Sequence, residues 1–222
     1  NAAPQIVNCL FIENTADNAS ILYNIDGASP HFINCIFANN INTSVYYGLS
    51  FNFLNCRSTF ENCISWGNTS NSIVDSNGSF STVNYCDIQG GHIGGTANID
   101  VDLDFVNAAN GDFYLQTGSP CIDTGSNDAV PGTITTDASG LSRFIDGNCD
   151  TIATVDMGAY EYSRRYLGDL NDDCVVNLPD LAVLAGGWGS STTGADVAIG
   201  YGDGIVDMVD LAVLADNWLS TW

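Results

Sequence analysis

Oxygen-bearing side chains recur at alternate positions of a twelve-residue stretch in the last quarter of the sequence. The residues at positions one, three, five, nine and twelve of this stretch are Asp169, Asn171, Asp173, Asn177 and Asp180. Position seven is Val175, whose backbone carbonyl adds a sixth oxygen. Hard divalent cations take six to eight oxygen ligands, and alternate residues of a tight loop can converge on one ion. The stretch therefore predicts a calcium site.

Position six of this loop departs from the usual pattern. A loop that turns this sharply normally has glycine there, because glycine adopts left-handed backbone angles at little cost. The residue in this chain is Cys174. We therefore expect a strained turn and weaker cation binding.

Each candidate loop leads into an apolar segment. The segment from Asp180 to Trp188 recurs almost unchanged from Asp210 to Trp218, 30 residues later. Both copies place apolar residues at helical spacing, and each begins with Asp, which suits the N-terminus of a helix. The sequence thus predicts two loop–helix repeats.

The second loop fits the ligand register less well. In the register set by Asp210, positions one and three are Ile199 and Tyr201, which carry no carboxylate. An insertion of three residues would instead allow Asp196 to take the first position. The second ligand set is then Asp196, Asp203, Ile205 through its carbonyl, Asp207 and Asp210. We expect two calcium ions in all.

The charge balance favours a cation as partner. The chain has 26 acidic residues against four arginines and no lysine, a net charge of −22. Nucleic acids and anionic membrane surfaces are excluded as partners because both need clustered basic residues. No apolar run reaches the roughly 18 residues that span a bilayer, so membrane insertion is not expected.

Elsewhere, few residues suit catalysis. Asp100, Asp102 and Asp104 alternate and would share one face of a strand. They fit a hydrophilic edge or an extra calcium site better than the paired carboxylates of a glycoside hydrolase. Arg57 and Arg143 lie in no recognisable motif. We expect both arginines to be surface ion-pair partners.

The first hundred residues contain a repeat centred on cysteine. Four segments align without gaps on Cys9, Cys35, Cys63 and Cys86, at spacings of 26, 28 and 23 residues. The position three before the cysteine is always apolar: Ile6, Phe32, Phe60 and Val83. The residue before the cysteine is Asn in the first three copies, and Asn tolerates tight left-handed turns. Such columns predict stacked coils.

These segments resemble the repeats of right-handed parallel β-helix proteins, a type common among secreted bacterial proteins. The resemblance extends through Asn98–Leu115, Gly118–Gly125 and Val155–Tyr162. It implies a mainly β fold, with a parallel β-helix over residues 1–165 whose closing segment covers about residues 92–165.

The loop–helix pair resembles dockerin domains over residues 166–222. This resemblance implies a small α-helical domain with paired EF-hand-type loops and a cohesin-like partner. The implied recognition residues precede the closing Asp of each loop, and here they are Leu178, Pro179, Met208 and Val209. They are apolar rather than hydroxylic, which argues against an ordinary cohesin but still indicates a protein contact.

The chain has eight cysteines. The four in the repeat are expected to stack inside successive coils, mostly as free thiols. For a disulfide we predict Cys121 with Cys149.

These observations favour a non-catalytic, secreted structural protein at the cell surface or outside the cell. Since Asn1 is not an initiator Met, we expect a mature chain without its signal peptide. Ile6 and Phe11 lie in a first coil that begins almost at once, so we expect head-to-tail self-association into a fibre or surface layer through this coil and the C-terminal domain. The competing explanation is that Asn1 was preceded by more of a longer β-helix or by a domain that caps this coil. The alternatives are a dockerin-bearing accessory or C-terminal fragment of an extracellular polysaccharide-degrading or polysaccharide-binding protein and, less favoured, a polysaccharide lyase or glycoside hydrolase.

Overall fold

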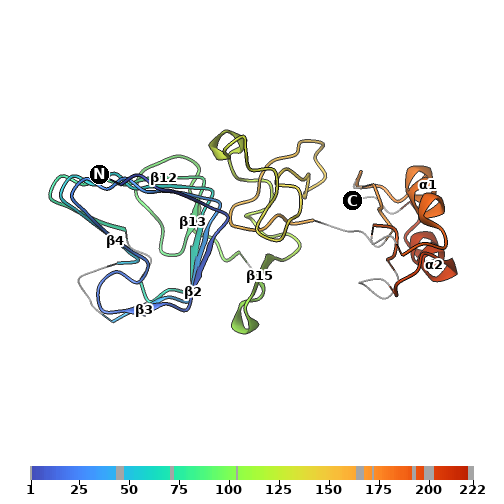
Figure 1. Ribbon diagram of the computed structural model, residues 1–222, viewed down its shortest axis with the longest axis horizontal. Helices are drawn as coiled ribbons and strands as arrows, with labels where there is room; N and C mark the ends of the chain where they lie inside the picture. Colours follow the sequence, from blue (N-terminus) through green and yellow to red (C-terminus); the bar gives the residue numbers. More distant parts are fainter. Residues whose placement is uncertain are drawn as a thin grey trace. The chain divides into compact units, whose positions relative to one another are not determined.

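The computed structural model describes residues 2–43, 48–70, 73–103, 105–163, 168–171, 173–191, 194–197 and 203–219 (Figure 1). Asp104, Ile199 and Tyr201 lie outside these residues. The chain forms two compact units. The solenoid unit comprises Asn1–Asn148 and Ile152–Tyr162, and the loop–helix unit comprises Cys149–Thr151 and Ser163–Trp222.

The solenoid unit is a parallel β-solenoid of about three turns, as the repeat predicts (Figure 1). One sheet contains β1 (Gln5–Val7), β5 (His31–Ile33), β9 (Thr59–Glu61) and β12 (Thr82–Asn84). The second contains β2 (Leu10–Ile12), β6 (Ile36–Ala38), β10 (Ile64–Trp66) and β13 (Asp87–Ile88). The third contains β4 (Leu22–Ile25), β8 (Ser50–Phe53) and β11 (Ile73–Ser76), and β3 (Thr15–Ala16) pairs with β7 (Ile41–Asn42). All these pairs are parallel and join equivalent positions of successive coils.

The apolar columns form the interior of the coils. Phe32 stacks on Phe60 with ring centroids 5.1 Å apart, and Phe37 meets Phe60 edge-on. Cys35, Cys63 and Cys86 are fully buried in the same core as small apolar groups. The predicted column is therefore confirmed for these coils.

The turn column explains the recurring asparagine. Asn8, Asn34 and Asn62 have φ of 53°, 50° and 52°, in the left-handed region. Asparagine adopts this region more readily than most residues. The fourth copy has Tyr85 with φ of 51°, so this backbone conformation persists without the favoured residue.

The segment after the repeats forms a second layer. Residues 96–99 pair with the last coil, since Thr96 O accepts from Tyr85 N and Ile99 N donates to Cys86 O. The antiparallel hairpin of β14 (Phe105–Asn107) and β15 (Asp112–Leu115), which flanks the 3₁₀ turn η1 (Ala108–Asn110), follows. Phe113 and Leu115 of β15 pack in one apolar core with Ile36 and Ile64 of the solenoid sheet.

The remainder of this layer contains the 3₁₀ turn η2 (Asn127–Ala129) and lies along the asparagine turns of several coils. The side chain of Asn8 donates to Thr136 O, that of Asn34 to Asp156 O and that of Asn62 to Ser126 O. The predicted closing segment therefore also covers a side of the solenoid and connects its turns.

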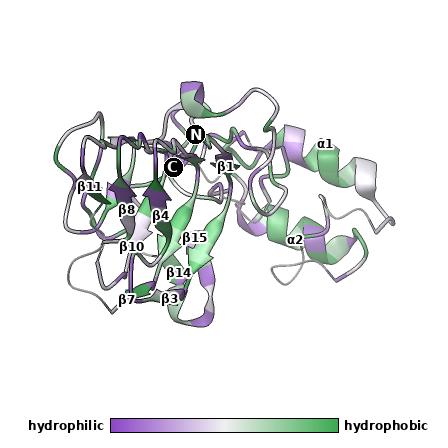
Figure 2. Cartoon of the chain, turned by 60° about the vertical axis from the view of Figure 1, so that its left-hand side comes forward, coloured by the Kyte–Doolittle hydropathy of each residue, from purple (hydrophilic) through white to green (hydrophobic). Residues whose placement is uncertain are grey.

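The loop–helix unit contains α1 (Leu178–Gly187) and α2 (Met208–Asp216). Both helices begin with a capping box, in which Asn177 and Asp207 are the N-caps and Asp180 and Asp210 are the third helical residues. Its core consists of five buried residues: Val176, Leu184, Ala195, Val206 and Leu214. Much of the surface of each helix is hydrophobic (Figure 2). Some of these apolar side chains, such as Leu178 and Met208, remain exposed.

The disulfide prediction was wrong. Cys149 bonds to Cys174, within the loop–helix unit, and Cys121 is a free thiol buried against Asp87. The spacing of the cysteines along the chain does not indicate this pairing. Cys174 is also the residue at loop position six, so the disulfide anchors the turn that lacks glycine.

We expect thiol titration to give six reactive thiols in denaturant before reduction and eight after it. The six free cysteines are Cys9, Cys35, Cys56, Cys63, Cys86 and Cys121. In the folded protein Cys9 should react first, because it is half-buried and the others are buried. A count of four before reduction would contradict this assignment.

Candidate metal centre

The first loop brings three carboxylates together. Asp169, Asp173 and Asp180 each place a carboxylate oxygen within 4.8 Å of the others. Asp169 and Asp180 are buried and Asp173 is exposed. Among the residues that the structure describes, this is the only group of three potential ligands from Asp, Glu, His or Cys with that spacing.

The loop backbone holds these carboxylates in place. Asp169 accepts hydrogen bonds from Asp173 N (3.2 Å) and Cys174 N (2.9 Å). Asp180 accepts from Leu170 N (2.7 Å) through one oxygen and from Asn177 N (2.8 Å) through the other. The backbone hydrogen bonds therefore hold the carboxylates of Asp169 and Asp180, from opposite ends of the loop, close together.

The donor set fits a hard cation. It combines three carboxylates with the amide oxygens of Asn171 and Asn177 and the carbonyl of Val175, all oxygen. Asn177 Nδ2 donates to Val175 O at 3.1 Å, so two of these groups are neighbours. Cys174 has φ of 67°, the left-handed angle that loop position six requires. Its sulfur is bound to Cys149 and is not a ligand.

The second loop repeats this hydrogen-bond pattern with Asp196 in the first place. Asp196 accepts from Asp203 N (2.9 Å) and Gly204 N (2.8 Å), as Asp169 does from Asp173 and Cys174. Asp210 accepts from Val197 N through one oxygen and from Asp207 N through the other, as Asp180 does in the first loop. The three-residue insertion is therefore consistent with the local geometry. Ile205 stands two residues after Asp203, at the position of Val175.

The predicted interface residues of this unit are exposed. Leu178 is 68% and Met208 65% exposed, and Pro179 and Val209 are exposed as well. These residues occupy equivalent places in the first turns of α1 and α2. The unit thus presents two similar apolar surfaces.

In the solenoid unit, Asp87 is a titratable residue that the sequence pattern did not reveal. Its side chain is buried, and it accepts hydrogen bonds from Val101 N and from the Cys121 thiol. Burial raises the pKa of Asp87 to about 6, although the bond from Val101 opposes the shift. The carboxylates of Asp100 and Asp102 nearby raise this pKa further.

The raised pKa of Asp87 predicts a pH effect on stability. The unfolded chain loses this proton near pH 4 and the folded chain near pH 6, so stability falls as pH rises between these values. Two pKa units correspond to at most about 3 kcal/mol. We expect the stability difference between Asp87→Asn and the native chain, measured by denaturant unfolding, to grow over that interval in favour of the variant. Asp128→Asn, at an exposed position, serves as control; a difference that does not vary with pH would contradict the assignment.

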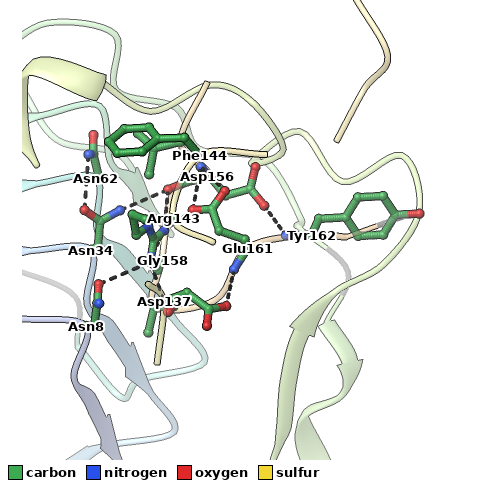
Figure 3. A network of polar contacts seen from close by, with 12 residues as sticks. Asn8, Asn34, Asn62, Asp137, Arg143, Phe144, Asp156, Gly158, Glu161 and Tyr162 are labelled. Atoms are coloured by element: carbon green, nitrogen blue, oxygen red, sulfur yellow. Dashed lines mark hydrogen bonds and ion pairs between the residues drawn. The ribbon is translucent and has the colours of Figure 1, made fainter. Parts of the chain in front are cut away.

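Arg143 is not the surface residue that we predicted. It is fully buried and forms an ion pair with Glu161, which is also buried (Figure 3). Its guanidinium donates to Asn8 Oδ1 (3.2 Å), Ala159 O (3.1 Å) and Gly158 O (3.1 Å). The arginine therefore connects the second layer to the first coil. Arg57, by contrast, is exposed and lies 4.7 Å over the Phe80 ring.

The acidic partners of Arg143 are held by backbone groups. Asp156 accepts from Asp123 N and Tyr162 N, and Asp137 accepts from Glu161 N (Figure 3). Burial raises the pKa of Glu161 and of Asp156 above their usual range, and neighbouring carboxylates raise both further, whereas the Arg143 guanidinium opposes the shift. Both carboxylates are buried.

Within the described residues, neither helix is both long and apolar enough to cross a membrane. Comparison with known proteins gives no relatives: no family model, no curated protein and no solved structure matches this chain.

Proposed function

We propose that this chain is a non-catalytic structural module of an extracellular assembly, stabilised by two calcium ions and able to associate with further copies head to tail. The observation that carries the proposal is that the apolar side chains of the first coil are less buried than the equivalent side chains of the second coil. Phe32 and Phe37 are 2% and 1% exposed, whereas their first-coil equivalents Ile6 and Phe11 are only half-buried. Among the described residues, the first-coil edge, defined by β1, β2 and β4, presents these apolar side chains, and in the proposal a second copy covers them.

The strands at this edge support an interaction by strand or side-chain contact. β1, β2 and β4 each end their sheet, so their outer backbone groups lack a strand partner among the described residues. Burying each half-exposed apolar side chain contributes up to about 1.5–3 kcal/mol. A few such side chains are enough for a specific contact.

The complementary surface in the proposal is the loop–helix unit of a second copy. Leu178, Pro179, Met208 and Val209 are exposed there in the first turns of the helices that follow the two proposed calcium loops. A contact that joins two different surfaces does not need to close, and its repetition gives a fibre. The assembly would then require calcium.

The remaining parts of the proposal rest on general tendencies. We propose a right-handed winding, because parallel crossovers are right-handed in about 98% of cases. The Cys149–Cys174 disulfide suits an oxidising compartment, which supports secretion to the cell surface or beyond. We propose that the two units are of the bacterial β-helix and dockerin types that their sequences resemble.

A second function has its own supporting observation. The apolar surfaces at the starts of α1 and α2 would also suit a cohesin-like partner, and the chain would then attach a polysaccharide-degrading or polysaccharide-binding protein to a scaffold. Attachment requires no contact with Ile6 or Phe11, so the two functions separate experimentally.

Sedimentation and electron microscopy with and without calcium test the proposal. We expect polymers in calcium and single chains after chelation. The double variant Leu178→Glu/Met208→Glu should remain unassembled in calcium, while Ile93→Glu, at a fully exposed loop position of the solenoid, should assemble normally. Single chains of the native protein at high concentration in calcium, with capture by a cohesin, would favour attachment instead.

A further inference from the structure

Two asparagine ladders each run in one direction along the solenoid, whereas in a third column the bond from Asn62 Nδ2 to Asn34 Oδ1 (3.4 Å) runs the opposite way. In the first, Asn14 Nδ2 donates to Asn40 Oδ1, and Asn40 Nδ2 donates to Asn68 Oδ1. In the second, Asn24 Nδ2 donates to Asn52 Oδ1 at 2.7 Å. Every bond in these two ladders runs from a coil to the next coil along the chain. Each coil in a ladder must therefore offer an acceptor to the preceding coil and a donor to the following one.

The second ladder ends on a carboxylate. Asn24, Asn52 and Asp75 are in register across β4, β8 and β11, and Asn52 Nδ2 donates to Asp75 Oδ1 at 2.8 Å. Ser81 supplies two further donors to Asp75, from its hydroxyl (2.9 Å) and from its backbone N–H (2.8 Å). An ionised carboxylate has no hydrogen to donate. Asp75 thus accepts the last hydrogen bond of the ladder and has no hydrogen to donate to a further coil.

The opposite end of this ladder offers an acceptor. Asn24 uses its amide hydrogens on Asn52 and Ser58, and no described residue donates to its Oδ1. If the last coil of one copy stacked on the first coil of another, Asp75 would face Asn24 Oδ1 in the place of a donor. Two acceptors, one of them charged, would then meet where the ladder requires a hydrogen bond.

The rest of the last coil also resists stacking. Residues 96–99 already bond to Tyr85 and Cys86 beside β12 and β13. In the third sheet, β11 pairs only with β8 among the described strands. Asp75 therefore stands on the strand of the last coil whose edge is most open to another chain.

We infer that Asp75 is a stop residue, which prevents the last coil of one copy from stacking on the first-coil edge of another. This inference rests on the proposed function, and it specifies the contact: the first-coil edge meets the loop–helix unit of a second copy and not its solenoid. The exposed Leu178 and Met208 provide the apolar surface for that contact. Polymers then depend on calcium, since solenoids alone do not join.

The substitution Asp75→Asn tests the stop directly. Its amide oxygen can accept from Asn52 Nδ2 and the Ser81 hydroxyl, as Asn52 Oδ1 does from Asn24 and Ser58. Its nitrogen takes the place of the oxygen that accepts from Ser81 N–H, so that bond is lost, and it adds the donor that Asn24 Oδ1 requires. The experiment uses the full chain in chelator, where the calcium-dependent contact is absent. We expect sedimentation velocity to show self-association at least about tenfold stronger than for the native chain, with slower hydrogen exchange in β4 and β11 at high concentration.

The matched control is Asp75→Ala, which removes the charge but adds no donor, and it should not associate. Asp75→Gln presents the same amide on a longer side chain and provides a second variant if Asp75→Asn fails to fold. Equal association of Asp75→Ala and the amide variants, or no association of a folded amide variant, would overturn the inference. Since all these measurements are made in chelator, they are independent of whether the native chain polymerises in calcium.

Discussion

Chelation of calcium should unfold the loop–helix unit and leave the solenoid folded. Without an ion, the clustered carboxylates of Asp169, Asp173 and Asp180 repel one another. A ligand present at a thousand times its Kd stabilises the folded state by about 4 kcal/mol per site. Two such sites contribute about 8 kcal/mol, which is comparable to the whole stability of a small domain.

Tryptophan fluorescence and circular dichroism follow this transition well. Trp188 and Trp218 belong to the loop–helix unit, whereas Trp66 lies in the solenoid. We expect chelation to abolish the helical signal and shift the fluorescence, while the β signal and its melting temperature persist. Identical melting curves with and without chelator would exclude a structural calcium ion.

Substitutions distinguish the effect of removing a calcium ligand from the effect of removing any negative charge. Asp180→Ala should behave like the chelated protein even in excess calcium, because Asp180 both closes the loop and accepts backbone bonds from Leu170 and Asn177. Asp216→Ala is the matched control, since Asp216 is exposed at the end of α2. It should leave calcium binding and the melting curve unchanged.

Removal of Arg143 is expected to destabilise the solenoid unit by about 3–5 kcal/mol, the usual cost of leaving one partner of a buried ion pair alone. In Arg143→Met, Glu161 loses its buried counter-ion, and Asn8, Gly158 and Ala159 lose a donor. Denaturant unfolding monitored by β circular dichroism measures the loss.

A double variant shows whether the unpaired carboxyl of Glu161 causes the loss of stability in Arg143→Met. Arg143→Met/Glu161→Gln should be more stable than Arg143→Met alone, because Glu161 without the guanidinium must either remain an unpaired buried charge or bind a proton, whereas glutamine is neutral at every pH. Arg57→Met should have a much smaller effect, since Arg57 is exposed. If the double variant were no better than the single one, lost packing and not charge would explain the cost.

The repeat was readable from the sequence because each coil uses the same local chemistry. The apolar positions, the cysteines and Asn8, Asn34 and Asn62 each recur once per coil, so their stacking follows from the spacing alone. The alternating oxygen ligands from Asp169 to Asp180 were equally visible, since a loop of twelve residues brings them together without distant partners.

The fate of Arg143 and the cysteine pairing depended on contacts between distant residues. Arg143 is buried because the second layer brings it to Asn8, 135 residues away in the chain, and no local pattern distinguishes it from an exposed arginine. Cys149 pairs with Cys174, and not with Cys121, because the chain places Cys149 in the loop–helix unit and Cys121 beside Asp87. The sequence by itself therefore determined the elements that repeat or close locally. The tertiary structure alone decided which single residues meet across layers, because burial and charge compensation arise only when remote segments pack together.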